Sequence, residues 1–126
     1  DHGTGVVDSM ACNPPEVPAH VHLHKGWFKD TVPEWRKTNT KPISFIHMDA
    51  DIYSSTREVL FEINSQIRPG TIIVFDEFTN FRLSGKMSNW REHEFKALVE
   101  WIEGCSRVVQ PLNRNWAYQA TCVVVS

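Results

Sequence analysis

Acidic side chains gather at two places in this sequence of 126 residues, and each place directly follows an apolar run. Asp49 and Asp51 follow the first run, and Asp76 and Glu77 follow the second. Carboxylates that crowd together either take up protons with raised pKa values or share a cation, and oxygen ligands of this kind suit Mg²⁺, Mn²⁺ or Ca²⁺. The two clusters predict a site for a hard divalent ion, provided that the fold brings them to one place.

Any one of these acids also has a simpler interpretation. Asp51 would cap the helix that follows it and Glu77 would face water, because acids are stabilised near helix N-termini and are common there. Two clusters that converge are more typical of a functional site. The metal site is therefore the favoured hypothesis.

The elements around the acids predict that the clusters do converge. Residues 42–49 and 71–75 are apolar runs of the length of buried parallel strands. Between them, N-cap residue types at positions 54–56 precede apolar residues at helical spacing up to Ile67, and Pro69 and Gly70 end the run. A strand–helix–strand unit places the carboxyl ends of both strands at one edge of a parallel sheet, where ligands bind.

The rest of the chain predicts one α/β domain over residues 1–126. Residues 1–19 are rich in Gly and Pro and predict a loop-rich segment. Apolar residues that alternate with histidines predict a strand near 20–24. A helix is expected from Thr31, and apolar residues at helical spacing predict another over 95–102 that ends at Gly104. Residues 107–112 and 116–125 predict a closing antiparallel hairpin.

Composition excludes several classes of protein. The 13 basic residues against 15 acidic ones give a net charge of −2, without the basic excess that nucleic-acid binding requires. No apolar stretch approaches the ~18 residues of a membrane span. The 3 cysteines form no Cys-x-x-Cys pair and are expected to be thiols, which favours a cytoplasmic location.

Histidines and tryptophans offer weaker candidates. The histidines at 20, 22 and 24 could ligate zinc, although a solvated strand face is the favoured interpretation. His47 is expected to be a hydrogen-bonded histidine in the core. Trp27 and Trp90 lie near predicted loops and are the best candidates among the tryptophans for lining a pocket.

Four segments together resemble one known family: KGWFKDTVPEW, FIHMDADIYSST, RPGTIIVFDEF and REHEFKALVEW. From about Val21 to the C-terminus, the sequence is similar to the macrocin O-methyltransferase (TylF-like) family of class I S-adenosylmethionine-dependent methyltransferases. The resemblance implies a seven-stranded Rossmann-like sheet whose last two strands are antiparallel. It also implies a small-molecule acceptor, a sugar or small natural product whose hydroxyl group is methylated with the help of Mg²⁺. By the same resemblance, the metal ligands would be Asp49, Asp76 and Glu77, and Asp51 would be the general base.

The sequence departs from the family where the cofactor should bind. The family has a glycine-rich turn after its first strand and an acid after its second, and neither is present here in clear form. Asp8 is the remaining candidate for that acid, and Gly26 and Trp27 would approach the adenine edge. We therefore expect the C-terminal part of a methyltransferase, with an incomplete sheet, an unpaired edge, poor activity on its own and self-association.

Two alternatives stay open. The chain could be a non-catalytic methyltransferase-like remnant that serves as a binding module. It could also be a Mg²⁺-dependent, aspartate-based phosphatase-like hydrolase with Asp49 as the nucleophile, although the lysine expected between the clusters is absent from residues 58–68.

Overall fold

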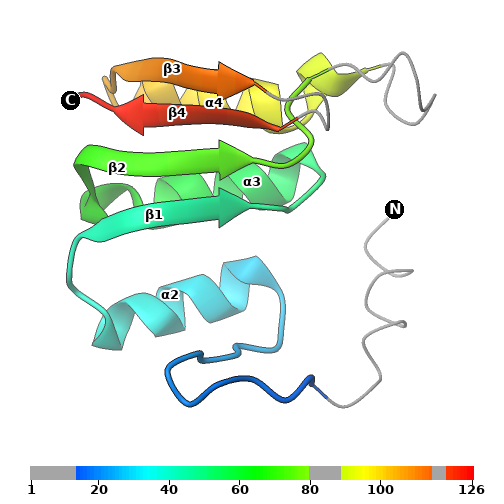
Figure 1. The fold of residues 1–126 in the computed structure, drawn as a ribbon, viewed down its shortest axis with the longest axis vertical. Helices are drawn as coiled ribbons and strands as arrows, with labels where there is room; N and C mark the ends of the chain where they lie inside the picture. Colours follow the sequence, from blue (N-terminus) through cyan, green and yellow to red (C-terminus); the bar gives the residue numbers. More distant parts are fainter. Residues whose placement is uncertain (1–13, 80–88, 115–118) are drawn as a thin grey trace.

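The computed structural model describes residues 14–79, 89–114 and 119–126, and its centre is a four-stranded sheet in the order β1-β2-β4-β3 (Figure 1). The strands are β1 (Ile43–Met48), β2 (Ile67–Phe75), β3 (Val109–Arg114) and β4 (Ala120–Val124). β1 and β2 are parallel, whereas β4 is antiparallel to both β2 and β3. The predicted α/β fold, with a parallel pair and a closing hairpin, is confirmed.

The helices are α2 (Phe28–Thr38), α3 (Tyr53–Glu62) and α4 (Glu94–Gly104), with short 3₁₀ turns η1 (Asn64–Gln66) and η2 (Trp90–Glu92). α3 and α4 cover the same face of the sheet, and α2 lies beside the β1 edge (Figure 1). Their apolar side chains pack on the inward side chains of the strands to form the core, which includes Met48, Leu60, Ile73, Phe75, Trp101 and Val124. None of the helices within the described ranges is long and apolar enough for a membrane span.

The opposite face of the sheet carries no helix among the described residues (Figure 1). Phe45 and His47 point to this face, because they alternate with the inward Ile46 and Met48. Phe45 is 58% exposed, and only Met48 of this strand is buried. The expectation that β1 is a fully buried strand is therefore wrong, since one covering layer is missing from the described part. The predicted self-association stays a prediction.

The link between the parallel strands also differs from the expectation. α3 ends at Glu62, and Ile67 begins β2, so that Pro69 and Gly70 lie inside the strand. The pairing of β1 with β2 shifts its register between Ile43 and Phe45, which accommodates Pro69 and Gly70 within the strand. The buried Ile67 fits a helical and a strand pattern equally well, which explains the difference. The residue before the first turn of α3 is Ile52, and no side chain caps this helix.

Between residue 14 and the start of β1, the chain contains no strand. Residues 14–25 form neither helix nor strand, and Val21 and Leu23 are exposed without a partner strand, so the predicted strand near 20–24 is wrong. α2 begins at Phe28, earlier than expected, and the Thr31 hydroxyl donates a hydrogen bond to the Trp27 carbonyl. The predicted short strand near the N-terminus lies outside the described residues. Helix α4 confirms the prediction for residues 95–102.

Candidate active site

The two acid clusters lie together at one edge of the sheet. β1 and β2 end side by side (Figure 1), and the register pairs Met48 with Phe75. The backbone N–H of Asp76 donates to the Met48 carbonyl at 2.9 Å, which continues the pairing beyond the end of β2. One carboxylate oxygen each of Asp49, Asp76 and Glu77 then lies within 4.8 Å of the others. The predicted convergence is present, and the role of these acids as metal ligands stays a prediction.

Asp51 occupies a tight turn after β1. Its φ angle is +57°, and the N–H of Ile52 donates to the Ala50 carbonyl across it at 2.6 Å. Positive φ values are unfavourable for residues with a Cβ atom, although aspartate and asparagine tolerate them better than most. This strained turn returns the chain toward Glu77 and leaves the Asp51 residue exposed.

Glu77 is the most strongly perturbed acid of the site. Its pKa is raised to about 8, first by hydrogen bonding between its carboxyl group and that of Asp51, then by burial, and then by the negative charges of Asp51, Glu94 and Asp76. Its Oε2 is buried and has no hydrogen-bond partner among the described residues. A buried carboxylate oxygen without a donor, next to further carboxylates, fits a cation as its missing partner. The three acids therefore suit a hard divalent ion.

Asp76 is held from two sides. Its Oδ1 lies 3.2 Å from Nε2 of His47, and it also accepts a hydrogen bond from the side-chain amide of Gln119. His47 is not a core residue, since its side chain is 49% exposed on the uncovered face of the sheet. The sequence spacing could have predicted that His47 lies near the acids, because His47 and Asp49 are two residues apart and such residues share one face of a strand.

Glu94, the first residue of α4, is a site residue that the sequence analysis did not identify. It is fully buried, and its Oε2 accepts a hydrogen bond from the Glu77 N–H at 3.2 Å. Its Oε1 accepts a longer one from the Ala50 N–H at 3.5 Å. Burial raises its pKa to about 7, against the lowering effect of the two hydrogen bonds. The only signal in the sequence is an acid in the first helical turn of REHEFKALVEW.

The residues proposed for the cofactor are not gathered by the described structure. Asp8 lies outside the described residues. Gly26 and Trp27 precede α2, whose N-terminus faces the sheet edge where β1 ends (Figure 1). Gly26 has a φ of +149°, and a Cβ there would lie 2.8 Å from Cγ2 of Thr31, so packing already explains this glycine. The assignment of these residues to S-adenosylmethionine binding stays a prediction.

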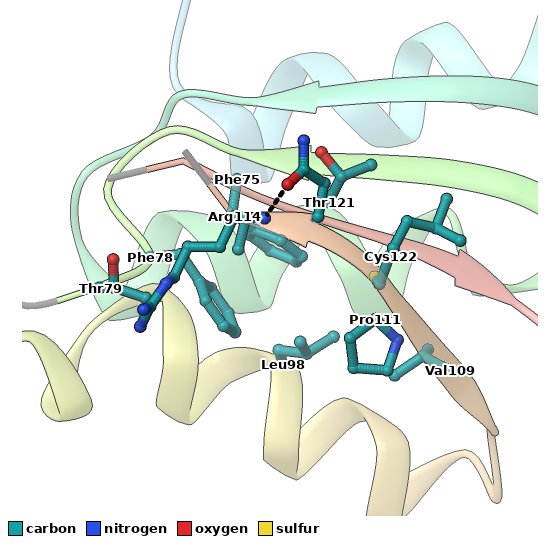
Figure 2. A pocket seen from close by; sticks show the side chains of 12 residues that line it. Phe75, Phe78, Thr79, Leu98, Val109, Pro111, Arg114, Thr121 and Cys122 are labelled. Atoms are coloured by element: carbon teal, nitrogen blue, oxygen red, sulfur yellow. Dashed lines mark hydrogen bonds between the residues drawn. The ribbon is translucent and has the colours of Figure 1, made fainter. Parts of the chain in front are cut away.

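A cavity of about 400 Å³ lies beside the end of β2, between α4 and the β3–β4 hairpin. Figure 2 shows Phe75 and Leu98 along its wall, with the side chain of Arg114 extending beside Phe78 toward Thr79. Its lining is mainly apolar, and its volume suits part of a small molecule. Trp27 and Trp90 do not line it. Trp90 instead packs edge-on against Phe95, with ring centres 5.2 Å apart.

Comparisons with known proteins agree with this architecture. The sequence model of the family described as "Macrocin-O-methyltransferase (TylF)" matches residues 17–107. A curated relative from Streptomyces olivaceus, 8-demethyl-8-(2,3-dimethoxy-alpha-L-rhamnosyl)-tetracenomycin-C 4'-O-methyltransferase, is 34% identical over 58 residues. That match covers 46% of this chain and 21% of the relative, so the chain spans a small part of its length.

Solved structures give the same result for the fold. CalS11, a TDP-rhamnose 3'-O-methyltransferase of calicheamicin biosynthesis, superposes with a TM-score of 0.61 at 25% identity. The match covers 80% of this chain and 41% of CalS11. The O-methyltransferase NovP superposes with a TM-score of 0.59 at 20% identity, over 80% of this chain and 36% of NovP. The sheet described here is thus a partial class I methyltransferase fold.

Proposed function

We propose, because this chain belongs to the macrocin-O-methyltransferase (TylF) family, that it serves in an enzyme that uses S-adenosylmethionine and Mg²⁺ to methylate a hydroxyl group of a sugar or sugar-bearing natural product. The names of the tetracenomycin relative and of CalS11 both refer to rhamnose, which supports a sugar as acceptor. The single observation that carries the proposal is the convergence of three carboxylates within 4.8 Å in a chain of this family.

The residues that would hold Mg²⁺ are Asp49, Asp76 and Glu77. The first is exposed and the other two are half-buried, so that the ion would meet both protein and acceptor. When bound, Mg²⁺ lowers the pKa of a hydroxyl group that it contacts. His47 would orient the Asp76 carboxylate through the hydrogen bond between them.

Asp51 is the proposed general base. Its exposed position beside Glu77 would allow its carboxylate to accept the proton of an acceptor hydroxyl group. The rigid turn around it, closed by the Ile52 N–H, would keep the carboxylate in place during that transfer. A base held next to the metal ligands would be well placed to remove the proton of a weakly acidic hydroxyl group.

S-adenosylmethionine is proposed from the family alone, as the source of an electrophilic methyl group. Asp8, Gly26 and Trp27 stay the candidate residues of this chain for contacting it. The apolar cavity between α4 and the hairpin would take an apolar part of the acceptor, since its walls offer few polar partners.

A non-catalytic binding module is the second candidate. It is favoured by one observation, namely that three carboxylates are gathered in an arrangement that could hold a cation whether or not methyl transfer takes place. The phosphatase-like alternative has no support, because the matching family is a methyltransferase family.

The test is formation of S-adenosylhomocysteine and of a methylated rhamnoside, followed by mass spectrometry, with the protein that carries this sequence. We expect activity that EDTA abolishes and Mg²⁺ restores. Asp51→Asn should lower the rate by about 10²–10⁴-fold, whereas Asp30→Asn, at an exposed position of α2, should leave it unchanged. Activity that survives EDTA would contradict the metal assignment. Metal binding without methyl transfer would instead support the binding module.

A further inference from the structure

Two short loops carry the acids, and one side chain joins them. The β1 loop is residues 49–52 and the β2 loop is residues 76–79. We infer that Glu94 is a positioning residue that holds these two loops in the arrangement that brings their carboxylates together. This inference rests on the proposed function for its catalytic meaning, whereas the contact itself can be tested without it.

The two oxygens of one carboxylate serve different loops. Oε1 accepts from the N–H of Ala50, which lies between Asp49 and Asp51 in the chain. Oε2 accepts from the N–H of Glu77 in the other loop. Each loop is thus tied to Glu94 through its backbone, so that its acidic side chains remain free to face a ligand.

Glu94 itself is fixed by the helix that carries it. Ala97, Leu98 and Trp101 lie on the buried side of α4 together with Glu94, and all belong to the interior of the domain. The position of Glu94 is therefore set by the core rather than by the loops. The positions of the two loops then depend on α4, and α4 sets the spacing between the acid clusters.

The residue type also argues for this role. Only a carboxylate offers two acceptor oxygens and no donor, so glutamate is the residue of this length that can accept from both loops. Glutamine would satisfy one N–H and turn its own NH₂ group toward the other. Burial beside Asp51, Asp76 and Glu77 makes the charged form of Glu94 costly, and no Lys or Arg among the described residues forms an ion pair with Glu94 to offset that cost. The two hydrogen bonds donated by the loop backbones stabilise the charged form of Glu94.

The experiment compares the wild-type chain with Glu94→Gln and with a matched control, Glu100→Gln. Glu100 lies on the same helix and also accepts hydrogen bonds across a helix contact, from Tyr53 and Arg57 of α3. Two quantities are measured: Mn²⁺ affinity by calorimetry, and amide hydrogen exchange at Ala50 and Glu77 by NMR. The first reports the acid site and the second reports the contact alone.

We expect Glu94→Gln to weaken Mn²⁺ binding by about 10- to 100-fold, as is typical when residues that orient metal ligands are lost. Exchange should accelerate at one or both of the two amides, with protection unchanged in β2 and β4. Glu100→Gln should change neither quantity.

Equal Mn²⁺ affinity and equal exchange in Glu94→Gln and the wild type would overturn the inference. If the wild type binds no Mn²⁺, the metal part of the proposed function fails, and exchange at the two amides still decides the role of Glu94. If Glu94→Gln does not fold, the wild type alone decides, because unprotected amides at both Ala50 and Glu77 would show that Glu94 does not hold the loops.

Discussion

The two ends of the sheet differ in how their buried polar and charged groups are paired. At the end where β2 begins, the Asn64 side chain accepts hydrogen bonds from Trp101 Nε1 and Arg107 Nε, both at 3.0 Å. The Arg107 guanidinium also donates to the carbonyls of Asn64, at 2.7 Å, and of Ile67, at 3.3 Å. One cation and several acceptors are thus matched, and this end stabilises the fold.

At the other end, acids outnumber their partners. Asp49, Asp51 and Glu77 form no ion pair with a Lys or Arg among the described residues, and the ion-pair partner that these residues give Asp76 is His47. A buried Glu77 oxygen has no donor within the described ranges, and Asp51 adopts a strained backbone conformation. Unmatched charge and strain persist at functional sites because the surrounding fold tolerates their cost. The difference separates a structural end from a site for a ligand.

The largest effect is expected from the structural end. Trp101→Ala removes a fully buried side chain and one partner of Asn64, and should lower the free energy of unfolding by about 3–5 kcal/mol. Urea unfolding followed by circular dichroism measures this loss. Phe45→Ala, on the uncovered face, is the control and should change stability by about 0.5 kcal/mol or less. A loss below about 1 kcal/mol for Trp101→Ala would remove the contrast between the two ends.

A smaller effect is expected for Arg107→Met. The substitution keeps the aliphatic stem but removes the hydrogen bonds that the guanidinium donates to the carbonyls of Asn64 and Ile67, which should cost about 1–3 kcal/mol in the same measurement. Arg57→Met is the matched control, because Arg57 pairs with Glu100 at the surface, where such pairs contribute about 1 kcal/mol or less. Equal losses in both variants would show that the network is no more than a surface ion pair.

The smallest effect should have the opposite sign and arise at the acid end. Asp51→Gly removes the Cβ atom at φ +57°, a negative charge beside Glu77 and the hydrogen bond between the two carboxyl groups. Relief of strain and repulsion should outweigh the lost hydrogen bond and raise the unfolding free energy by about 0.5 kcal/mol. Asp51→Asn separates the two causes, since it removes the charge and retains the Cβ atom. Destabilisation by Asp51→Gly, measured by urea unfolding, would argue against strain in this turn.

The sequence predicted the two parallel strands from their apolar runs and helix α4 from apolar residues at helical spacing. The strand before Asp49, the strand before Asp76 and helix α4 all appear at the predicted positions, whereas the full burial expected of the first strand does not. The convergence of the acids followed from the parallel pairing alone. The start of β2 did not follow, since Ile67 fits both periods.

Other site features depend on contacts that no local pattern encodes. Glu94 reaches the loops only because α4 packs beneath the ends of β1 and β2, which requires knowledge of helix placement. His47 is exposed because no layer covers that face among the described residues, whereas its apolar neighbours predict burial. The positive φ of Asp51 arises from the turn that Ile52 closes, and aspartate alone does not reveal it.

The most direct test of the central claim is thermal unfolding of the chain across a Mg²⁺ titration, with the Asp76→Asn, Glu77→Gln double variant alongside. The wild type should unfold at a temperature that rises steadily with Mg²⁺ concentration once that exceeds Kd, because the ion binds the folded state. The variant should show no such rise and should be at least as stable as the wild type without metal. Equal Mg²⁺-dependent stabilisation of both proteins would contradict a metal site built from these acids.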